Sequence, residues 1–253
     1  MRTLCVFYNK KKSINDRALS IIKLLRKNGY NVYINRYNKR AQLIVALGGD
    51  GTVLRAVNHT LTHSIPILPV SLGRLSFLSG TVQKNLFTDL DKFYQGKCKI
   101  TVRDTLCIIV HRKFRKVFVP IVNEAVLTRN SYQRLFDISV RSVELNYQLR
   151  SDGLIISTPT GSTAYNLAAG GKVLPPQAKK YVLTPICPFF HAKNSQINRT
   201  SKVLDLKQPV FIKAEGKKPN FVVVCDGHRI IKFGTGDTLE VRRGKNTFSL
   251  IKF

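Results

Sequence analysis

The sequence lacks long apolar runs, cysteine pairs and tryptophan. No run approaches the eighteen or so apolar residues of a membrane-spanning helix, so we expect a soluble protein that does not bind a membrane. The cysteines contain no C-x-x-C pair, and their odd number argues against a disulfide framework or a structural zinc site. We therefore predict no metal-ligating residues, reduced thiols and a cytoplasmic location. The five cysteines are Cys5, Cys98, Cys107, Cys187 and Cys225.

Glycine and proline are also few, at 16 and 10 of 253 residues, and no compositionally biased tract occurs. This composition excludes collagen-like and largely disordered chains. With 43% hydrophobic residues the chain can bury a sizeable core. Its length predicts one large domain or two modest ones.

Acidic residues are scarce, since 14 Asp and Glu stand against 42 Lys and Arg, giving a formal charge of +28. Such an excess is typical of proteins that bind nucleic acids or anionic membranes. However, the basic residues are spread along the chain, tryptophan is absent and no zinc-ligand spacing is present. We therefore expect no specific nucleic-acid partner, although a basic nucleic-acid-binding protein stays an alternative.

The first hundred residues alternate between strand and helix patterns. Apolar runs indicate strands, and apolar residues at helical spacing indicate helices between them. Together they predict an N-terminal α/β domain over residues 1–97 with a Rossmann-like open sheet. The expected strands cover residues 4–8, 30–34, 42–47 and 67–70, and the expected helices cover 14–25, 53–61 and 83–94.

After residue 97 the pattern changes to β-branched and aromatic runs separated by turn residues. This texture predicts a largely β C-terminal domain over residues 98–235, with the boundary near Gln95–Gly96. Only residues 163–169 look helical. Residues 236–253 form a last segment, whose alternating pattern after residue 246 allows it to return to the first domain. The expected strands cover residues 106–110, 117–122, 136–143, 154–157, 210–214 and 221–225.

The first chemical motif is a glycine-rich loop at residues 48–52, which follows the buried strand 42–47 and opens a helix. Glycines let backbone amides approach an anion, and a helix amino terminus favours phosphate. Asp50 within the loop suits a general base or a partner of a phosphate-bound metal. The same pattern also occurs in tight turns that bind no ligand.

The second motif is the hydroxyl-rich run Thr158–Asn166, placed just before an expected helix. Its hydroxyls can donate hydrogen bonds to a sugar or a pyrophosphate, and Tyr165 can stack or form a hydrogen bond. A turn that only caps a helix would have a similar composition.

Carboxylates are concentrated beside turns. Glu124 and the three Asp-Gly pairs at Asp50, Asp152 and Asp226 account for four of the fourteen acidic residues. Asn123–Glu124 follows one apolar run and Asp226 follows another, so both lie at expected strand ends. An Asn next to a Glu can bind hydroxyl groups and the edge of a base.

In their order and spacing these motifs resemble those of the ATP-dependent NAD kinase family, from about Leu4 to Gly227. The resemblance implies a nucleotide site between the two domains and homo-oligomers, dimers or tetramers, that complete it. Departures from the family pattern occur in residues 73–78, at Ser151 and at the displaced His191. The matching pieces are residues 48–52 with 54–56 behind them, 123–124, 152–154, 158–166 and 222–227.

The resemblance also implies roles. Asp50 would be the catalytic base that acts on the 2′-hydroxyl of the adenosine ribose of NAD, and Mg²⁺ would be carried with ATP. The glycine loop would line the ATP phosphates, and the segments around residues 123 and 163 would hold the adenosine. Asp152 and Asp226 would face the rest of the dinucleotide or a neighbouring subunit. The implied nucleotide-binding residues are Gly48, Gly49, Gly51, Thr52, Arg55, Phe77, Asn123, Glu124, Asp152, Thr160, Ser162, Thr163, Ala164, Tyr165 and Asp226.

A lipid kinase of the diacylglycerol or sphingosine type is the alternative enzyme, because such kinases carry a similar glycine loop with an aspartate. A lipid kinase should show an apolar entry for an acyl chain in place of the hydroxyl-rich run at residues 158–165.

Overall fold

The structure is a computed structural model that describes residues 2–10, 12–73, 77–130, 135–189, 200–215 and 220–253. The contacts within the chain divide it into two compact units. Unit 1 comprises Met1–Arg103 and Asn246–Phe253, and unit 2 comprises Asp104–Lys245.

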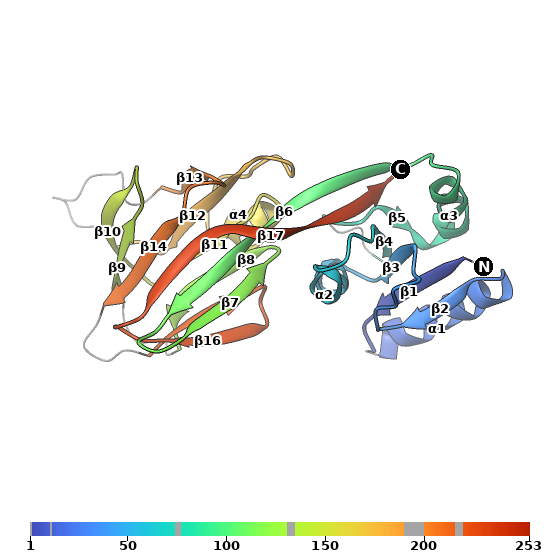
Figure 1. Cartoon of the computed structure of the whole chain (residues 1–253), viewed down its shortest axis with the longest axis horizontal. Helices are drawn as coiled ribbons and strands as arrows, with labels where there is room; N and C mark the ends of the chain where they lie inside the picture. The colour runs from blue at the N-terminus through green and yellow to red at the C-terminus, as the bar shows by residue number, and fades with distance from the viewer. Residues whose placement is uncertain (1, 11, 74–76, 131–134, 190–199, 216–219) are drawn as a thin grey trace. The chain divides into compact units, whose positions relative to one another are not determined.

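Unit 1 is an α/β unit built on parallel strands, as predicted (Figure 1). Its strands are neighbours in the order β4-β3-β1-β2, and Leu250 near the end of β17 pairs in parallel with Ile67 of β4. β1, β3 and β4 are buried at every residue, as strands covered by helices are. The elements are β1 (Thr3–Tyr8), α1 (Lys12–Lys27), β2 (Asn31–Ile34), β3 (Leu43–Leu47), α2 (Asp50–Thr60), β4 (Ile67–Ser71), β5 (Thr81–Val82), η1 (Gln83–Asn85) and α3 (Leu86–Tyr94).

Unit 2 is an antiparallel β unit made of two sheets, which confirms the largely β second domain. One sheet contains β10-β9-β14-β17 together with β6 and β7, and the other has the order β13-β12-β11-β8-β15-β16. A single core cluster includes Ile138 and Ile212 from the first sheet and Leu127 and Val223 from the second, so the sheets pack face to face. The strands are β6 (Lys99–His111), β7 (Lys116–Ile121), β8 (Glu124–Arg129), β9 (Phe136–Arg141), β10 (Asn146–Ser151), β11 (Gly153–Ser157), β12 (Lys180–Ile186), β13 (Lys202–Asp205), β14 (Val210–Glu215), β15 (Phe221–Cys225), β16 (Arg229–Phe233) and β17 (Thr238–Lys252).

Two long strands, β6 and β17, carry the chain from one unit to the other. The division falls after Arg103 in β6 and before Asn246 in β17, inside both strands. The boundaries predicted at residues 97 and 235 lie before these positions. The prediction used turn residues, which mark where strands begin and end, whereas the division falls inside two strands.

The helix expected over residues 163–169 is present but shorter than predicted. The chain forms a 3₁₀ turn, η2 (Gly161–Thr163), and then a four-residue helix, α4 (Tyr165–Ala168). Ala164 separates them with φ −94° and ψ −126°, which lies outside the helical region. The part of the chain that the structure describes contains no helix that is both long and apolar enough to cross a membrane. All five cysteines are free thiols.

Gly80 is required by packing in unit 1. A Cβ built on it would lie 2.3 Å from the carbonyl oxygen of Ile251 and 3.2 Å from Cδ of Pro69. We predict that Gly80→Ala lowers the free energy of unfolding by about 1–3 kcal/mol, because backbone atoms of β17 must move to make room. Thermal unfolding measures the effect. Gly236→Ala is the control, since its Cβ would meet no atom within 4 Å. Equal stability of the two variants would contradict the prediction.

Candidate active site

The glycine loop lies at the carboxyl end of β3 and leads directly into α2. The backbone N–H of Gly48 donates a hydrogen bond to the carbonyl of Val70 (2.9 Å), which ties the loop to the end of β4. Gly48 has φ +143°, and a Cβ there would lie 2.7 Å from Oγ1 of Thr52. The fold itself therefore requires glycine at position 48.

The fold does not require glycine at positions 49 and 51 in the same way. A Cβ on either residue would meet no atom within 4 Å, and neither has positive φ. Gly51 lies in the first turn of α2, where glycine costs about 1 kcal/mol relative to alanine. Gly49 is the N-cap and forms no side-chain capping hydrogen bond. Packing does not demand these two glycines, and their exposed backbone suits a helix terminus that an anion approaches closely.

Asp50 is the first residue of α2 and is half-buried. Its Oδ1 accepts a hydrogen bond from the backbone N–H of Leu78 (3.0 Å), which orients the carboxylate. Phe77 precedes Leu78 and is 67% exposed, and Arg55 is exposed on α2. Unit 1 thus brings the loop and the predicted Phe77 segment together through Asp50. Residues 74–76 of the predicted segment and His191 lie outside the described residues.

In unit 2, Asn123 lies in the short connection between β7 and β8, and Glu124 is the first residue of β8. Glu124 is 9% exposed, and its Oε2 has no hydrogen-bond partner among the described residues. Oδ1 of Asn123 is likewise buried without a described partner. Buried polar atoms normally have partners, so these two oxygens are candidates for binding a polar ligand.

Burial, and to a smaller extent the nearby Asp226 carboxylate, raises the pKa of Glu124 to about 7. The pKa of Asp226 is also raised by burial, although hydrogen bonds from the backbone amides of Val122 and Asn123 oppose that effect. Two coupled carboxyl groups in one buried place are typical of functional sites.

Some hydroxyl groups of the run Thr158–Asn166 form hydrogen bonds that stabilise the local backbone. The Ser162 hydroxyl donates to the carbonyl of Pro159 (2.7 Å) and accepts from the N–H of Leu174 (3.0 Å). The Thr158 hydroxyl donates to the carbonyl of Val122 (2.6 Å). The bonds from Thr158 to Val122 and from Leu174 to Ser162 join residues 36 and 12 positions apart, so the sequence did not indicate them. Thr160 is buried, Thr163 and Ala164 are half-buried, and Tyr165 is 47% exposed.

Asn166 also supports this turn, a role that the sequence did not indicate. Its Nδ2 donates to the carbonyls of Ser162 (2.9 Å) and Lys172 (3.1 Å), and its Oδ1 accepts from the Thr184 hydroxyl (2.6 Å). The side chain is fully buried. Asn166 is therefore a structural residue of the site.

The structure brings most of the predicted unit 2 residues to one end of the second sheet. Glu124 pairs with Ser157, and Ala125 pairs with Cys225, so Asn123, Thr158 and Asp226 meet there. Asp152 instead precedes β11 at its opposite end, where Gly153 pairs with Thr128. A five-residue strand spans about 16 Å, so Asp152 is not part of this cluster within one chain.

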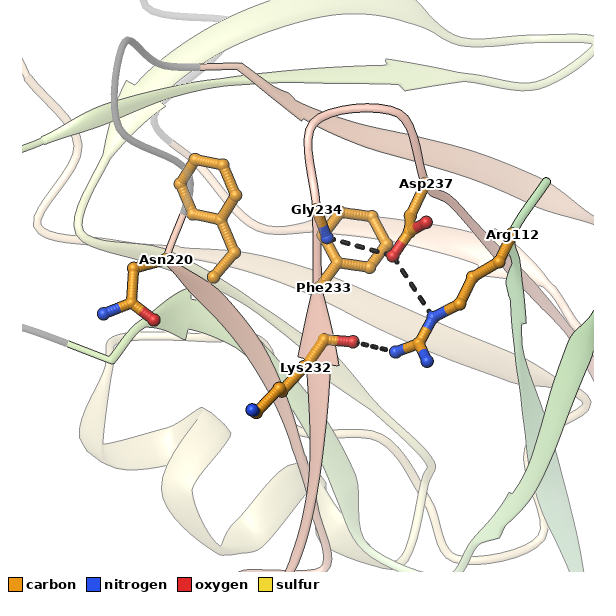
Figure 2. Close-up of a pocket in the computed structure, with 7 residues that line it drawn as sticks. Arg112, Asn220, Lys232, Phe233, Gly234 and Asp237 are labelled. Carbon is orange, nitrogen blue, oxygen red and sulfur yellow. Dashed lines mark hydrogen bonds and ion pairs between the residues drawn. The ribbon is translucent and has the colours of Figure 1, made fainter.

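A separate cavity of about 270 Å³ lies in unit 2 and contains none of the predicted site residues (Figure 2). Arg112 donates a hydrogen bond to the carbonyl of Lys232 and forms an ion pair with Asp237 (3.4 Å). Asp237 also accepts from the N–H of Gly234 (2.9 Å). Arg112 and Asp237, two of the charged groups of this cavity, are therefore bound to each other. Its lining is Arg112, Asn220, Phe221, Lys232, Phe233, Gly234 and Asp237.

An α/β unit with an aspartate in its glycine loop, followed by a β unit with a buried glutamate beside an asparagine, is the combination expected of a two-domain phosphotransferase. The comparisons with known proteins agree in both units. The ATP-NAD kinase N-terminal domain model matches residues 8–98, and the ATP-NAD kinase C-terminal domain model matches residues 122–253. The chain belongs to the ATP-NAD kinase family.

Individual relatives extend this result. The chain is 34% identical over 214 residues to an NAD kinase of Syntrophobacter fumaroxidans, covering 83% of this chain and 73% of the relative. The crystal structure of yeast NADH kinase complexed with NADH matches with a TM-score of 0.87 at 20% identity, covering 100% of this chain and 84% of that one. An Archaeoglobus fulgidus NAD kinase in complex with ATP matches with a TM-score of 0.78 at 23% identity, covering 100% and 94%. These two structures support the fold.

The raised pKa of Glu124 predicts a stability cost. The pKa of Glu124 rises from 4.5 to about 7 in the folded state. Between these two pH values the folded state therefore binds a proton that the unfolded state has lost. The contribution of Glu124 to stability therefore falls as the pH rises from about 4.5 to above 7. We expect Glu124→Gln to increase the free energy of unfolding at pH 8 by roughly 1–3 kcal/mol and to change it little at pH 4.5.

Denaturant unfolding at both pH values measures this difference. Glu144→Gln, a change at an exposed glutamate, controls for the altered net charge. A Glu124→Gln variant that is no more stable than the Glu144→Gln control at pH 8 would refute the electrostatic cost.

Proposed function

We propose that the chain transfers the γ-phosphoryl group of ATP to the 2′-hydroxyl of the adenosine ribose of NAD, giving NADP. The proposal rests above all on the two domain models, which together match most of the chain and name this activity. The buried, unpartnered oxygens of Asn123 and Glu124 support it, because they suit the hydroxyls and base edge of a nucleoside.

The glycine loop is proposed to bind the ATP phosphates. Gly49 and Gly51 leave backbone amides accessible at the amino terminus of α2, where the helix dipole favours negative charge. Gly48 and Thr52 hold the loop in shape, since the Thr52 N–H donates to the carbonyl of Gly49 (2.9 Å). Exposed Arg55, on the same helix, adds positive charge for the phosphates.

Asp50 is proposed as the general base. A sugar hydroxyl is a weak nucleophile near neutral pH, and a carboxylate within hydrogen-bond reach can accept its proton. In the in-line step, the ribose 2′-oxygen bonds to the γ-phosphorus, the bond from that phosphorus to the bridging oxygen of ADP breaks, and the hydroxyl proton passes to Asp50. The bond from Leu78 to Asp50 keeps the carboxylate in one orientation for this task.

Mg²⁺ is proposed to arrive with ATP, coordinated by its phosphates, and to neutralise their charge. Mg²⁺ normally keeps several waters and takes only one or two protein carboxylates in such sites. Among the described residues no three His, Cys, Asp or Glu side chains form a group that could hold a metal.

The adenosine of NAD is proposed to bind at the start of β8. Asn123 and Glu124 would contact it directly, with Thr163, Ala164 and Tyr165 beside them and Thr160 and Ser162 shaping the turn. The exposed ring of Phe77 is proposed to contact an adenine ring. Carboxylate and amide oxygens at this position favour a polar nucleotide over the acyl chain of a lipid substrate.

Asp152 is proposed to act in the site of a neighbouring subunit of a homo-oligomer. Its place at the far end of β11 separates it from Asn123 and Glu124 within one chain, whereas the family motif includes it. A cytoplasmic location, a dimeric or tetrameric state and the absence of a specific nucleic-acid partner complete the proposal.

Asp50→Asn is predicted to lower turnover at least about 100-fold, because the side chain keeps its shape but loses the base. The purified protein is given Mg-ATP and NAD, and a strictly NADP-dependent dehydrogenase scores the product. Asp16→Asn, at an exposed position of α1, is the matched control. Near-normal NADP production by a folded Asp50→Asn variant would remove Asp50 from this role, and no product from the unmodified chain would overturn the function.

Subunit complementation tests the role of Asp152. Asp50→Asn and Asp152→Asn chains should each be nearly inactive alone. When co-expressed as dimers, they should recover roughly a quarter of normal activity, because half of the dimers are mixed and one site in each mixed dimer is intact. The activity of the co-expressed chains is compared with that of each variant alone. Mixed dimers that stay inactive would contradict action between subunits.

A further inference from the structure

The connection between β7 and β8 is held in an unusual way. Only Val122 and Asn123 separate the two strands, and neither is glycine or proline. β7 and β8 belong to different sheets and do not pair with each other, so the backbone groups of this connection are not held by a hairpin turn and must find partners elsewhere.

Asp226 binds the N–H side of the connection. Its carboxylate accepts hydrogen bonds from the N–H of Val122 (3.0 Å to Oδ2) and of Asn123 (2.7 Å to Oδ1). Its own N–H donates to the carbonyl of Glu124 (2.9 Å). Asp226 is 9% exposed, so these bonds form away from water, where they are strongest.

Thr158 binds the carbonyl side. Its hydroxyl donates to the carbonyl of Val122 (2.6 Å) and its N–H donates to the carbonyl of Asn123 (2.9 Å). The Thr158 hydroxyl in turn accepts from the N–H of Gly161 (3.0 Å). Gly161 packs against the same connection, since a Cβ there would lie 2.2 Å from the carbonyl oxygen of Asn123.

The backbone of Asp226 is in the left-handed region, with φ +46°, and Gly227 follows with φ +69°. Non-glycine residues adopt positive φ uncommonly, and aspartate and asparagine do so more readily than most. A residue in this conformation, with its carboxylate bound to two amides of the connection between β7 and β8, points to a functional constraint.

We propose that Asp226 is a positioning residue, which together with Thr158 fixes the backbone of Asn123 and Glu124 so that their side-chain oxygens meet the adenosine of NAD. This inference rests on the proposed function and assigns Asp226 to holding the connection instead of contacting the ligand. Removing the clamp formed by Asp226 and Thr158 should weaken NAD binding while the glycine loop of unit 1 still binds ATP.

Asp226→Asn tests the proposal, because asparagine tolerates the same φ but turns an NH₂ group toward an amide that needs an acceptor. We expect NAD affinity without ATP, and kcat/KM for NAD, to fall about 10- to 100-fold, since small misplacements at reacting groups have effects of this size. KM for ATP should change less than about 2-fold. Calorimetry with NAD alone and steady-state kinetics give these values.

Asp237→Asn is the matched control. Asp237 also accepts a backbone hydrogen bond, from Gly234 (2.9 Å), in the turn that follows β16, the strand paired with β15 (Figure 2). We expect this variant to keep the NAD affinity of the unmodified chain. Thr158→Val removes the other half of the clamp without a change of charge and should weaken NAD binding in the same selective way, while Thr158→Ser should restore it.

Two results would overturn the inference while leaving the function intact. One is a folded Asp226→Asn or Thr158→Val variant that binds NAD as the unmodified chain does. The other is an equal loss for NAD and ATP, which indicates general damage. If the unmodified chain itself makes no NADP, the proposed function fails instead, and binding of NAD alone still tests the clamp.

Discussion

The arrangement of unit 2 depends on how the backbone between β7 and β8 is satisfied. Three strands, β8, β11 and β15, are neighbours in one sheet, and the residues at their shared end exchange hydrogen bonds across chain separations of up to 104 residues. Asp226 occupies the N–H groups of the connection and Thr158 its carbonyls, so no glycine or proline is needed there. Because other residues bind the backbone of the connection, the side-chain oxygens of Asn123 and Glu124 are not needed for that purpose and have no partner among the described residues. The chemistry proposed for unit 2 depends on these two oxygens.

The buried carboxyl group of Glu124, at the start of β8, also lowers the stability of the folded state. Glu124 is buried beside a second carboxyl group, and the ionised form that best accepts hydrogen bonds from hydroxyls is the form that burial disfavours. Unit 1 shows a parallel case, because Gly51 occupies a helical position where alanine would be more stable and no neighbouring atom excludes it. Both departures from the most stable choice fall in segments that resemble nucleotide-binding motifs, as expected where function competes with stability.

Local sequence patterns predicted the glycine loop well, because a buried five-residue strand, three glycines and an amphipathic helix are adjacent in the chain. The alternation of strand and helix in unit 1 was readable for the same reason. β8 was not predicted, since only Val122 and Asn123 separate it from β7. The bonds of Thr158 to Val122, Ser162 to Leu174 and Asn166 to Thr184 were not predicted either, since they join residues 12 to 36 positions apart. The role now inferred for Asp226 depends on strand register, which the sequence alone does not specify.

The charge of +28 takes on a narrower meaning in this light, because two anionic nucleotides gain from a positive field without any polyanionic partner. If the start of β8 binds the adenosine of NAD, a crystal structure of the protein with NAD will show adenosine atoms within about 3 Å of Oδ1 of Asn123 and Oε2 of Glu124. Adenosine bound elsewhere, for instance in the cavity beside Arg112, with both oxygens facing water, would contradict it.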